Sequence, residues 1–141
     1  LRGHILSSAV SATNPSASGT IAAPGPFGAV LASASLSVGQ AWDVFSTFSF
    51  KKTSGTGTDG VSAFLALLVA QPDATFAEVR GSNVWTSPAS VGVFLPYGMR
   101  GRFVATQAGT HQLRVTAASV TSSISYETAG WSTDHYVMGS A

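Results

Sequence analysis

The chain has 141 residues, of which only 9% are charged, and its formal net charge is +1 at pH 7. So small a charge provides no basic surface to follow a phosphate backbone, which argues against a nucleic-acid partner. The absence of cysteine excludes disulfides, thiolate nucleophiles and cysteine-ligated zinc, and no run of about 18 apolar residues predicts insertion into a membrane.

The length fits a single domain over residues 1–141. Period-2 alternation of apolar and polar side chains recurs along it, whereas helical periodicity is almost absent. In THQLRVTA, for example, His111, Leu113 and Val115 share one face and Gln112 the other. The predicted strands are 4–10, 28–37, 42–51, 61–70, 74–79, 90–95, 99–106, 110–118 and 121–127, with a short strand at 134–138 left open.

The secondary structure of two segments is less clear from their sequences. Residues 61–70, VSAFLALLVA, permit a helix by composition, but strands are predicted on both sides, and a doubly buried strand fits better. Residues 11–27 are rich in Ser, Gly and Pro and are predicted to cross between sheets without forming a strand. Turn signals rich in Gly and Pro, such as LPYG (95–98), separate the predicted strands. Short strands with such turns between them predict an all-β, antiparallel, jelly-roll-like sandwich of about 8–10 strands.

The apolar faces of these strands predict the core. Its expected members are Phe48, Phe50, Leu65, Leu67, Phe103, Leu113 and Val115, and Phe45 and Phe64 are expected to join them.

The stretch STDH (132–135) brings a serine, an aspartate and a histidine together in the sequence. Adjacent residues of a strand point to opposite faces, so Asp134 and His135 cannot orient one another there. Carboxylates are scattered elsewhere, and no phosphate-binding glycine loop or set of metal ligands stands out. We therefore expect a terminal strand or tail, a protein that is not an enzyme, and no metal or other cofactor.

Aromatic residues beside turn signals are the candidate contact residues. Trp85 follows Asn83 in SNVWTSP, and Tyr97 lies in FLPYGM. Aromatic faces at loop tips, next to amides and hydroxyls, commonly bind sugars or protein surfaces. The alternative is that these rings pack over the open end of the sandwich, and the hairpin at 51–60 is a second candidate contact.

The order of segments resembles a known class of domain. A Ser/Thr/Gly-rich lead (11–38) is followed by AWDVFSTFSFKK and later by GRFVATQAGTHQLRVTAASV. Over most of residues 10–127 this resembles the small jelly-roll tip domains of bacteriophage tail fibres and receptor-binding proteins, which are similar to C1q/TNF-like sandwiches. The resemblance implies a C-terminal fragment of a longer fibre protein, a homotrimer in the virion, and loops that bind a bacterial surface receptor, either a polysaccharide or an outer-membrane protein.

Two other functions fit the same pattern. A carbohydrate-binding module of a secreted enzyme would be a monomer with a sugar site, whereas a capsid or head decoration protein would assemble in a particle without a receptor. Oligomeric mass separates the first alternative from the fibre domain.

Overall fold

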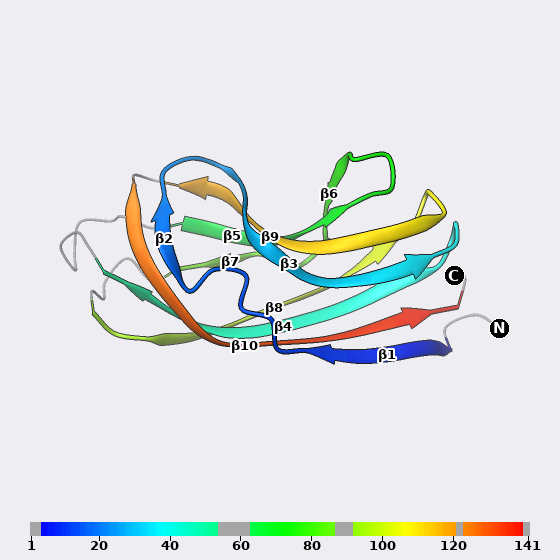
Figure 1. The fold of residues 1–141 in the computed structure, drawn as a ribbon, viewed down its shortest axis with the longest axis horizontal. Coiled ribbons are helices and arrows are strands. Elements are labelled where there is room, and N and C mark those ends of the chain that lie inside the picture. Colours follow the sequence, from blue (N-terminus) through cyan, green and yellow to red (C-terminus); the bar gives the residue numbers. More distant parts are fainter. Residues whose placement is uncertain (1–3, 54–62, 87–91, 121–122, 140–141) are drawn as a thin grey trace.

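Two antiparallel sheets pack face to face in the computed structural model, which describes residues 4–53, 63–86, 92–120 and 123–139 (Figure 1). The fold prediction is therefore confirmed: the described chain is an all-β sandwich without a helix. The ten strands are β1 (Ile5–Ser11), β2 (Ser18–Ile21), β3 (Gly25–Leu36), β4 (Ala41–Lys52), β5 (Ala63–Ala70), β6 (Phe76–Glu78), β7 (Val84–Trp85), β8 (Leu95–Val104), β9 (Gly109–Val120) and β10 (Ile124–Met138).

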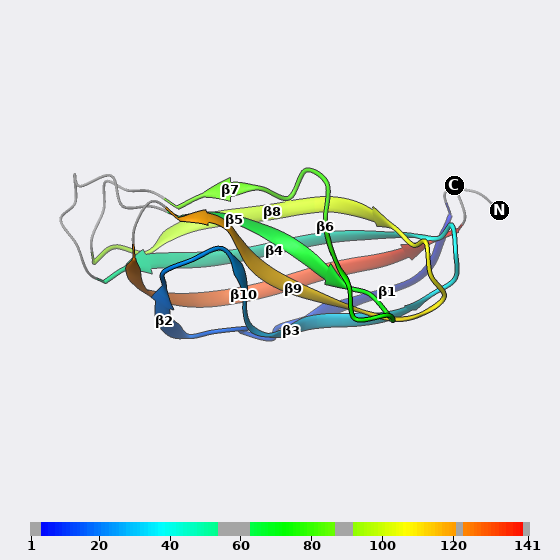
Figure 2. The same ribbon diagram turned by 90° about the horizontal axis from the view of Figure 1, so that it is seen from above.

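The first sheet has the strand order β1-β10-β4-β8, and β2 also pairs with β10. The second sheet has the order β3-β9-β5-β6, and β7 also pairs with β5. The chain stays in one sheet from β1 to β2 and from β5 to β7, and it changes sheets at every other connection between consecutive strands, as jelly-roll topologies do. Seen from above, the long strands of the two layers run roughly along one axis (Figure 2), which is the aligned packing of a β-sandwich.

Period-2 alternation divides β4 between the core and the surface. Its even-numbered residues from Trp42 to Lys52 are buried, and the odd-numbered residues from Asp43 to Lys51 are half-buried or exposed. The predicted core residues Phe48, Phe50, Leu65, Leu67, Phe103, Leu113 and Val115 are all at most 8% exposed.

Two of the expected core aromatics are not in the core. Phe45 is 41% exposed because it occupies an odd-numbered position of β4 and points away from the second sheet. Phe64 is half-buried, since it lies between the inward-facing Ala63 and Leu65 of β5. Over the described residues 63–70 the predicted strand is confirmed, since β5 is a strand buried on both faces; residues 61–62 lie outside the described residues.

The predicted crossover at 11–27 is wrong in part. It contains β2, which pairs with the first half of β10, and the first residues of β3. Four residues, SGTI, are too few to show an alternation among so many Ser and Gly residues, so only their pairing with β10 marks them as a strand.

The turn predicted at 95–98 is wrong, and the strand predicted at 90–95 is wrong over residues 92–94, which form no strand. Pro96, Tyr97 and Gly98 lie inside β8, which is paired with β4 along its whole length. Proline is tolerated in such an edge strand, where one side of the backbone has no ladder partner to lose. Of the segment before it, residues 87–91 lie outside the described residues, and β7 at 84–85 was not predicted.

The C-terminal stretch is a strand, as expected, but a much longer one. The segment predicted at 134–138 and residues 124–127 of the segment predicted at 121–127 belong to one strand, β10, which runs between β1 and β4; residues 121–122 lie outside the described residues. Its register shifts between Ala129 and Ser132, where Gly130 has a φ of 67°. This left-handed conformation favours glycine, and the resulting bulge lets one strand continue through a bend.

No helix long and apolar enough to cross a membrane occurs among the described residues.

Candidate binding site on the outer face of the first sheet

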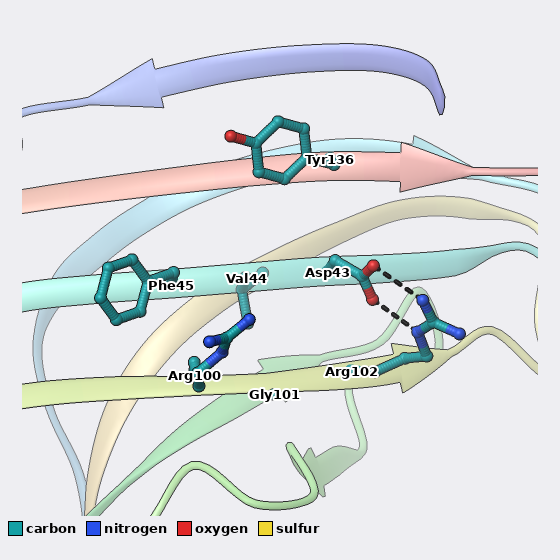
Figure 3. A pocket seen from close by; sticks show the side chains of 7 residues that line it. All are labelled: Asp43, Val44, Phe45, Arg100, Gly101, Arg102 and Tyr136. Atoms are coloured by element: carbon teal, nitrogen blue, oxygen red, sulfur yellow. Dashed lines mark hydrogen bonds and ion pairs between the residues drawn. The ribbon is translucent and has the colours of Figure 1, made fainter. Parts of the chain in front are cut away.

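Side chains from three neighbouring strands meet on the outer face of the first sheet (Figure 3). In β4 the outward residues include Asp43 and Phe45. The pairing registers place Tyr136 of β10 opposite Asp43 on one side and Arg102 of β8 opposite it on the other. Directly opposite residues of antiparallel strands point to the same face, so these side chains form a row across the sheet.

A second row lies one pleat further along. Asp134 of β10, Phe45 of β4 and Arg100 of β8 stand opposite one another. Between the two rows the surface has a hollow of about 380 Å³, lined by Asp43, Val44, Phe45, Arg100, Gly101, Arg102 and Tyr136. The Val44 side chain points into the core and Gly101 has none, so these two residues contribute backbone to the floor of the hollow.

One wall of the hollow is a fixed ion pair. Arg102 donates from Nε to Oδ1 of Asp43 at 2.6 Å and from Nη2 to Oδ2 at 2.8 Å. This two-bond geometry is the strong form of the arginine–carboxylate contact and holds both side chains in one orientation. The hydrogen bond to Asp43 raises the pKa of the Arg102 guanidinium above its already high ordinary value, so the guanidinium stays charged.

The opposite wall combines an aromatic ring with a second arginine. The Phe45 ring is 41% exposed, and the guanidinium carbon of Arg100 lies 5.7 Å from its centroid. The ring lies over Gly98, where a Cβ would make an ordinary van der Waals contact with it, 3.4 Å from Cε2 of Phe45. Tyr136, which is half-buried, adds a second ring and a hydroxyl (Figure 3). The hollow can thus hold a ligand that has an apolar face and several polar groups.

The three contact residues predicted from the sequence are not brought together. Asn83 and Trp85 are exposed, and the Trp85 ring lies against Phe64, with 4.8 Å between ring centroids, on the outer face of the second sheet. Tyr97 instead points between the sheets and stacks on Phe48 at 5.7 Å. A role of these residues in receptor binding stays a prediction, and the second candidate contact at 51–60 lies mostly outside the described residues.

The STDH segment behaves as strand geometry requires. Asp134 faces outward in β10, whereas His135 is buried and its Nδ1 accepts a hydrogen bond from Trp42 Nε1 at 3.1 Å. Burial lowers the pKa of His135, and the nearby Asp134 charge raises it to a smaller extent. Over the ranges that the structure describes, no three His, Asp or Glu side chains form a group able to hold a metal ion.

Sequence reasoning missed every residue of the hollow, although one signal was present. The alternation in DVFSTFSF puts Phe48 and Phe50 on one face and therefore Asp43 and Phe45 on the other. An aromatic ring on the polar face of a strand is an exception to the pattern and marks a candidate contact. The pairing of Asp43 with Arg102 carries no such local signal, because these residues are 59 positions apart.

Comparisons with known proteins identify the fold. No protein-family model matches the chain, and no curated protein matches it. A chain in the structure of infectious bursal disease virus, Gt strain, is 12% identical with a TM-score of 0.59, covering 94% of this chain and 33% of that one. A chain of another particle of the same virus is 14% identical with a TM-score of 0.56, covering 97% of this chain and 32% of that one.

A xylan-binding domain from Paenibacillus barcinonensis is also similar, with 12% identity, a TM-score of 0.48 and coverage of 99% and 98% of the two chains. The chain spans about a third of the length of the viral chains that it matches. At such identities the likeness shows that this chain has the jelly-roll β-sandwich fold found in domains of a viral particle.

Proposed function

We propose that this chain is a non-enzymatic attachment domain of a virus particle, the tip domain of a bacteriophage tail fibre, and that it binds a bacterial surface glycan in the hollow on the outer face of the first sheet. The observation that carries the proposal is the Phe45 ring, an exposed aromatic beside the oriented Asp43–Arg102 pair. Sugars have one face of C–H groups that packs on such rings, and neighbouring hydroxyls that suit paired donors and acceptors.

The construction of the hollow favours binding of a rigid, polar ligand. Its wall residues come from three adjacent strands rather than from loops, so they are held by the ladder of the sheet. Because the Asp43 and Arg102 side chains already hold each other in place, they lose little conformational entropy when a ligand binds. The likeness to domains of a viral particle agrees with the virion part of the proposal, although the same fold serves many functions.

A second candidate function rests on that likeness alone. The chain could be a shell or head decoration domain with no receptor site, since it shares a fold with chains of a viral particle. It would then bind no glycan, and its outer faces would contact other subunits. A carbohydrate-binding module of a secreted enzyme shares the sugar site but predicts a monomer.

The test compares two surfaces of the same molecule. The purified chain is titrated against an array of bacterial surface polysaccharides, together with Phe45→Ala, Trp85→Ala and the control Val104→Ala. Val104 is 45% exposed on β8 but does not line the hollow. We expect Phe45→Ala to weaken binding about tenfold or more and the other two variants to bind like wild type.

The other outcomes assign the function elsewhere. Loss of binding in Trp85→Ala with no change in Phe45→Ala would move the contact to the surface around Asn83 and Trp85. If the wild-type chain binds no polysaccharide at all, the attachment proposal is wrong and the shell domain is favoured. Equal thermal midpoints of the four proteins show that each comparison is made between folded chains.

A further inference from the structure

Arg100 is the cation of the hollow that no carboxylate neutralises. Among the described residues its guanidinium makes no ion pair, and its one ring contact is with Phe45. The side chain is exposed, on the outward face of β8. An arginine presents five N–H donors in a planar fork, and this fork matches the two oxygens of a carboxylate.

The other charges of the hollow cancel. The carboxylate of Asp43 already receives two hydrogen bonds from Arg102, so the pair is close to neutral as seen by a ligand. The lining then holds two cations, Arg100 and Arg102, and one anion, Asp43, which gives a net charge of +1. Asp134 does not line the hollow, and in the register it stands on the opposite side of Phe45 from Arg100.

We propose that the sugar bound in this hollow is an acidic one, whose carboxylate is received by Arg100 while its ring packs on Phe45. This inference rests on the proposed function and names its ligand class. The hydroxyls of the same sugar lie toward the Asp43–Arg102 pair and Tyr136, which form the other walls (Figure 3). A charge-assisted pair between a guanidinium and a carboxylate is about twice as strong as a neutral hydrogen bond, so the charge decides which sugar is preferred.

The chain offers little support for a general affinity for polyanions. Its net charge is +1, and the hollow contributes a single unpaired cation rather than a stripe of them. A sulfated polymer that adhered by charge alone would not need the Phe45 ring. The ring and Arg100 together therefore distinguish recognition of a sugar from adhesion to a polyanion.

The experiment uses polysaccharides with the same backbone and different charge. Binding of the purified chain to polygalacturonate is compared with binding to its methyl ester, which lacks the charges, and dextran sulfate is compared with dextran. We expect at least about a tenfold preference for polygalacturonate over the ester, which falls as salt is raised because the pair is exposed. Arg100→Gln should remove the preference, and Arg100→Lys, which keeps the charge without the fork, should keep part of it.

The results separate the two proposals. Equal binding of polygalacturonate and its ester, both lost in Phe45→Ala, overturns the acidic-sugar inference and leaves the glycan site standing. Binding of dextran sulfate and polygalacturonate that Phe45→Ala leaves unchanged is charge adhesion, which overturns the inference. Absence of binding to every polysaccharide overturns the proposed function and the inference with it. Unchanged thermal midpoints of the Arg100 variants show that any loss is one of contact rather than folding.

Discussion

Phe45 and Phe48 belong to the same strand but have opposite environments. Phe48 is 3% exposed and stacks on Trp131 with 4.1 Å between ring centroids, whereas Phe45 is 41% exposed on the other face. Removing a buried phenylalanine ring costs about 3–5 kcal/mol, and a surface substitution usually costs less than about 1 kcal/mol. We expect Phe48→Ala to show the large loss and Phe45→Ala the small one, measured by urea unfolding. Similar losses in both variants would mean that Phe45 supports the core.

His135 should make the stability of the protein depend on pH. Its pKa is lowered in the folded chain by burial, while the ordinary value of about 6.5 holds for the unfolded chain. As the pH falls, the unfolded chain therefore binds the proton first. The contribution of neutral His135 to the free energy of unfolding is fully present above about pH 6.5 and is lost as the pH falls from there toward the folded-state pKa. Protonation at Nδ1 would also remove the acceptor that Trp42 uses.

The matched variant is His135→Gln, which keeps an acceptor for Trp42 but cannot titrate. We expect the free energy of unfolding of wild type to fall more steeply than that of His135→Gln between pH 7 and pH 5. The difference between the two proteins isolates His135 from the other groups that titrate in this range. Parallel curves would contradict the prediction.

At the scale of elements, β8 passes close to the chain that joins β6 to β7. A Cβ on Gly101 would lie 2.1 Å from the carbonyl oxygen of Arg80 and 2.8 Å from Cγ1 of Val79. Backbone cannot yield as a flexible side chain does, so Gly101→Ala should cost several kcal/mol, about 2 or more. Gly98→Ala in the same strand is the control, because its nearest heavy atom is 3.4 Å away. Thermal unfolding of both variants measures the difference in stability between them. Equal stabilities would contradict the prediction, because they would show that the backbone around Arg80 moves aside easily.

The elements differ in how far their sequences predict them. Strong alternation in β9 predicted both the strand and its inward residues, such as Leu113 and Val115. In β4 the strand and the buried Phe48 were predicted, but the outward position of Phe45 was not. β2 and β7 are short and acquire their strand character from pairing with β10 and β5, which local patterns do not contain. The glycines and proline of β8 gave a turn signal, yet β4 supplies a partner to every residue there.

The candidate site was less predictable than the core for the same reason. Whether a side chain points inward depends on the alternation of its own strand, which the sequence displays. Which side chains become neighbours on the outer face depends on the register between strands that are far apart in the chain. The row Tyr136, Asp43 and Arg102 joins β10, β4 and β8 and exists only once those registers are known.

At the scale of the whole molecule, two edge strands lie side by side without any charge. β1 (ILSSAVS) and β3 (GPFGAVLASASL) contain no charged residue, and their Ser and Ala side chains, together with His135 and Val137 of β10, line a groove of about 290 Å³. β1 also exposes Ile5, Leu6 and Val10. Edge strands of monomers usually carry charges that prevent pairing with other chains, so this edge suits contact with further copies of the chain.

We therefore expect a homotrimer at micromolar concentration, with Val10 in the contact between protomers. Light scattering should give three times the chain mass for wild type, and Val10→Lys should shift the mass toward the monomer because it buries a charge in the contact. Val104→Lys, on the opposite edge of the first sheet, is the control. A wild-type monomer would contradict the expectation and favour a carbohydrate-binding module.

The pairing of the first strand with the last determines how the domain responds to pulling. Ile5 stands opposite Met138, and the backbone N–H of Gly139 donates to the carbonyl of His4 at 2.8 Å, so both ends of the sandwich chain leave from the same place. Tension applied there meets the β1–β10 hydrogen bonds one at a time, as when a zipper opens, rather than all together in shear. Since β1 pairs with no strand but β10 among the described residues, single-molecule stretching should detach β1 at low force, before the remaining strands separate.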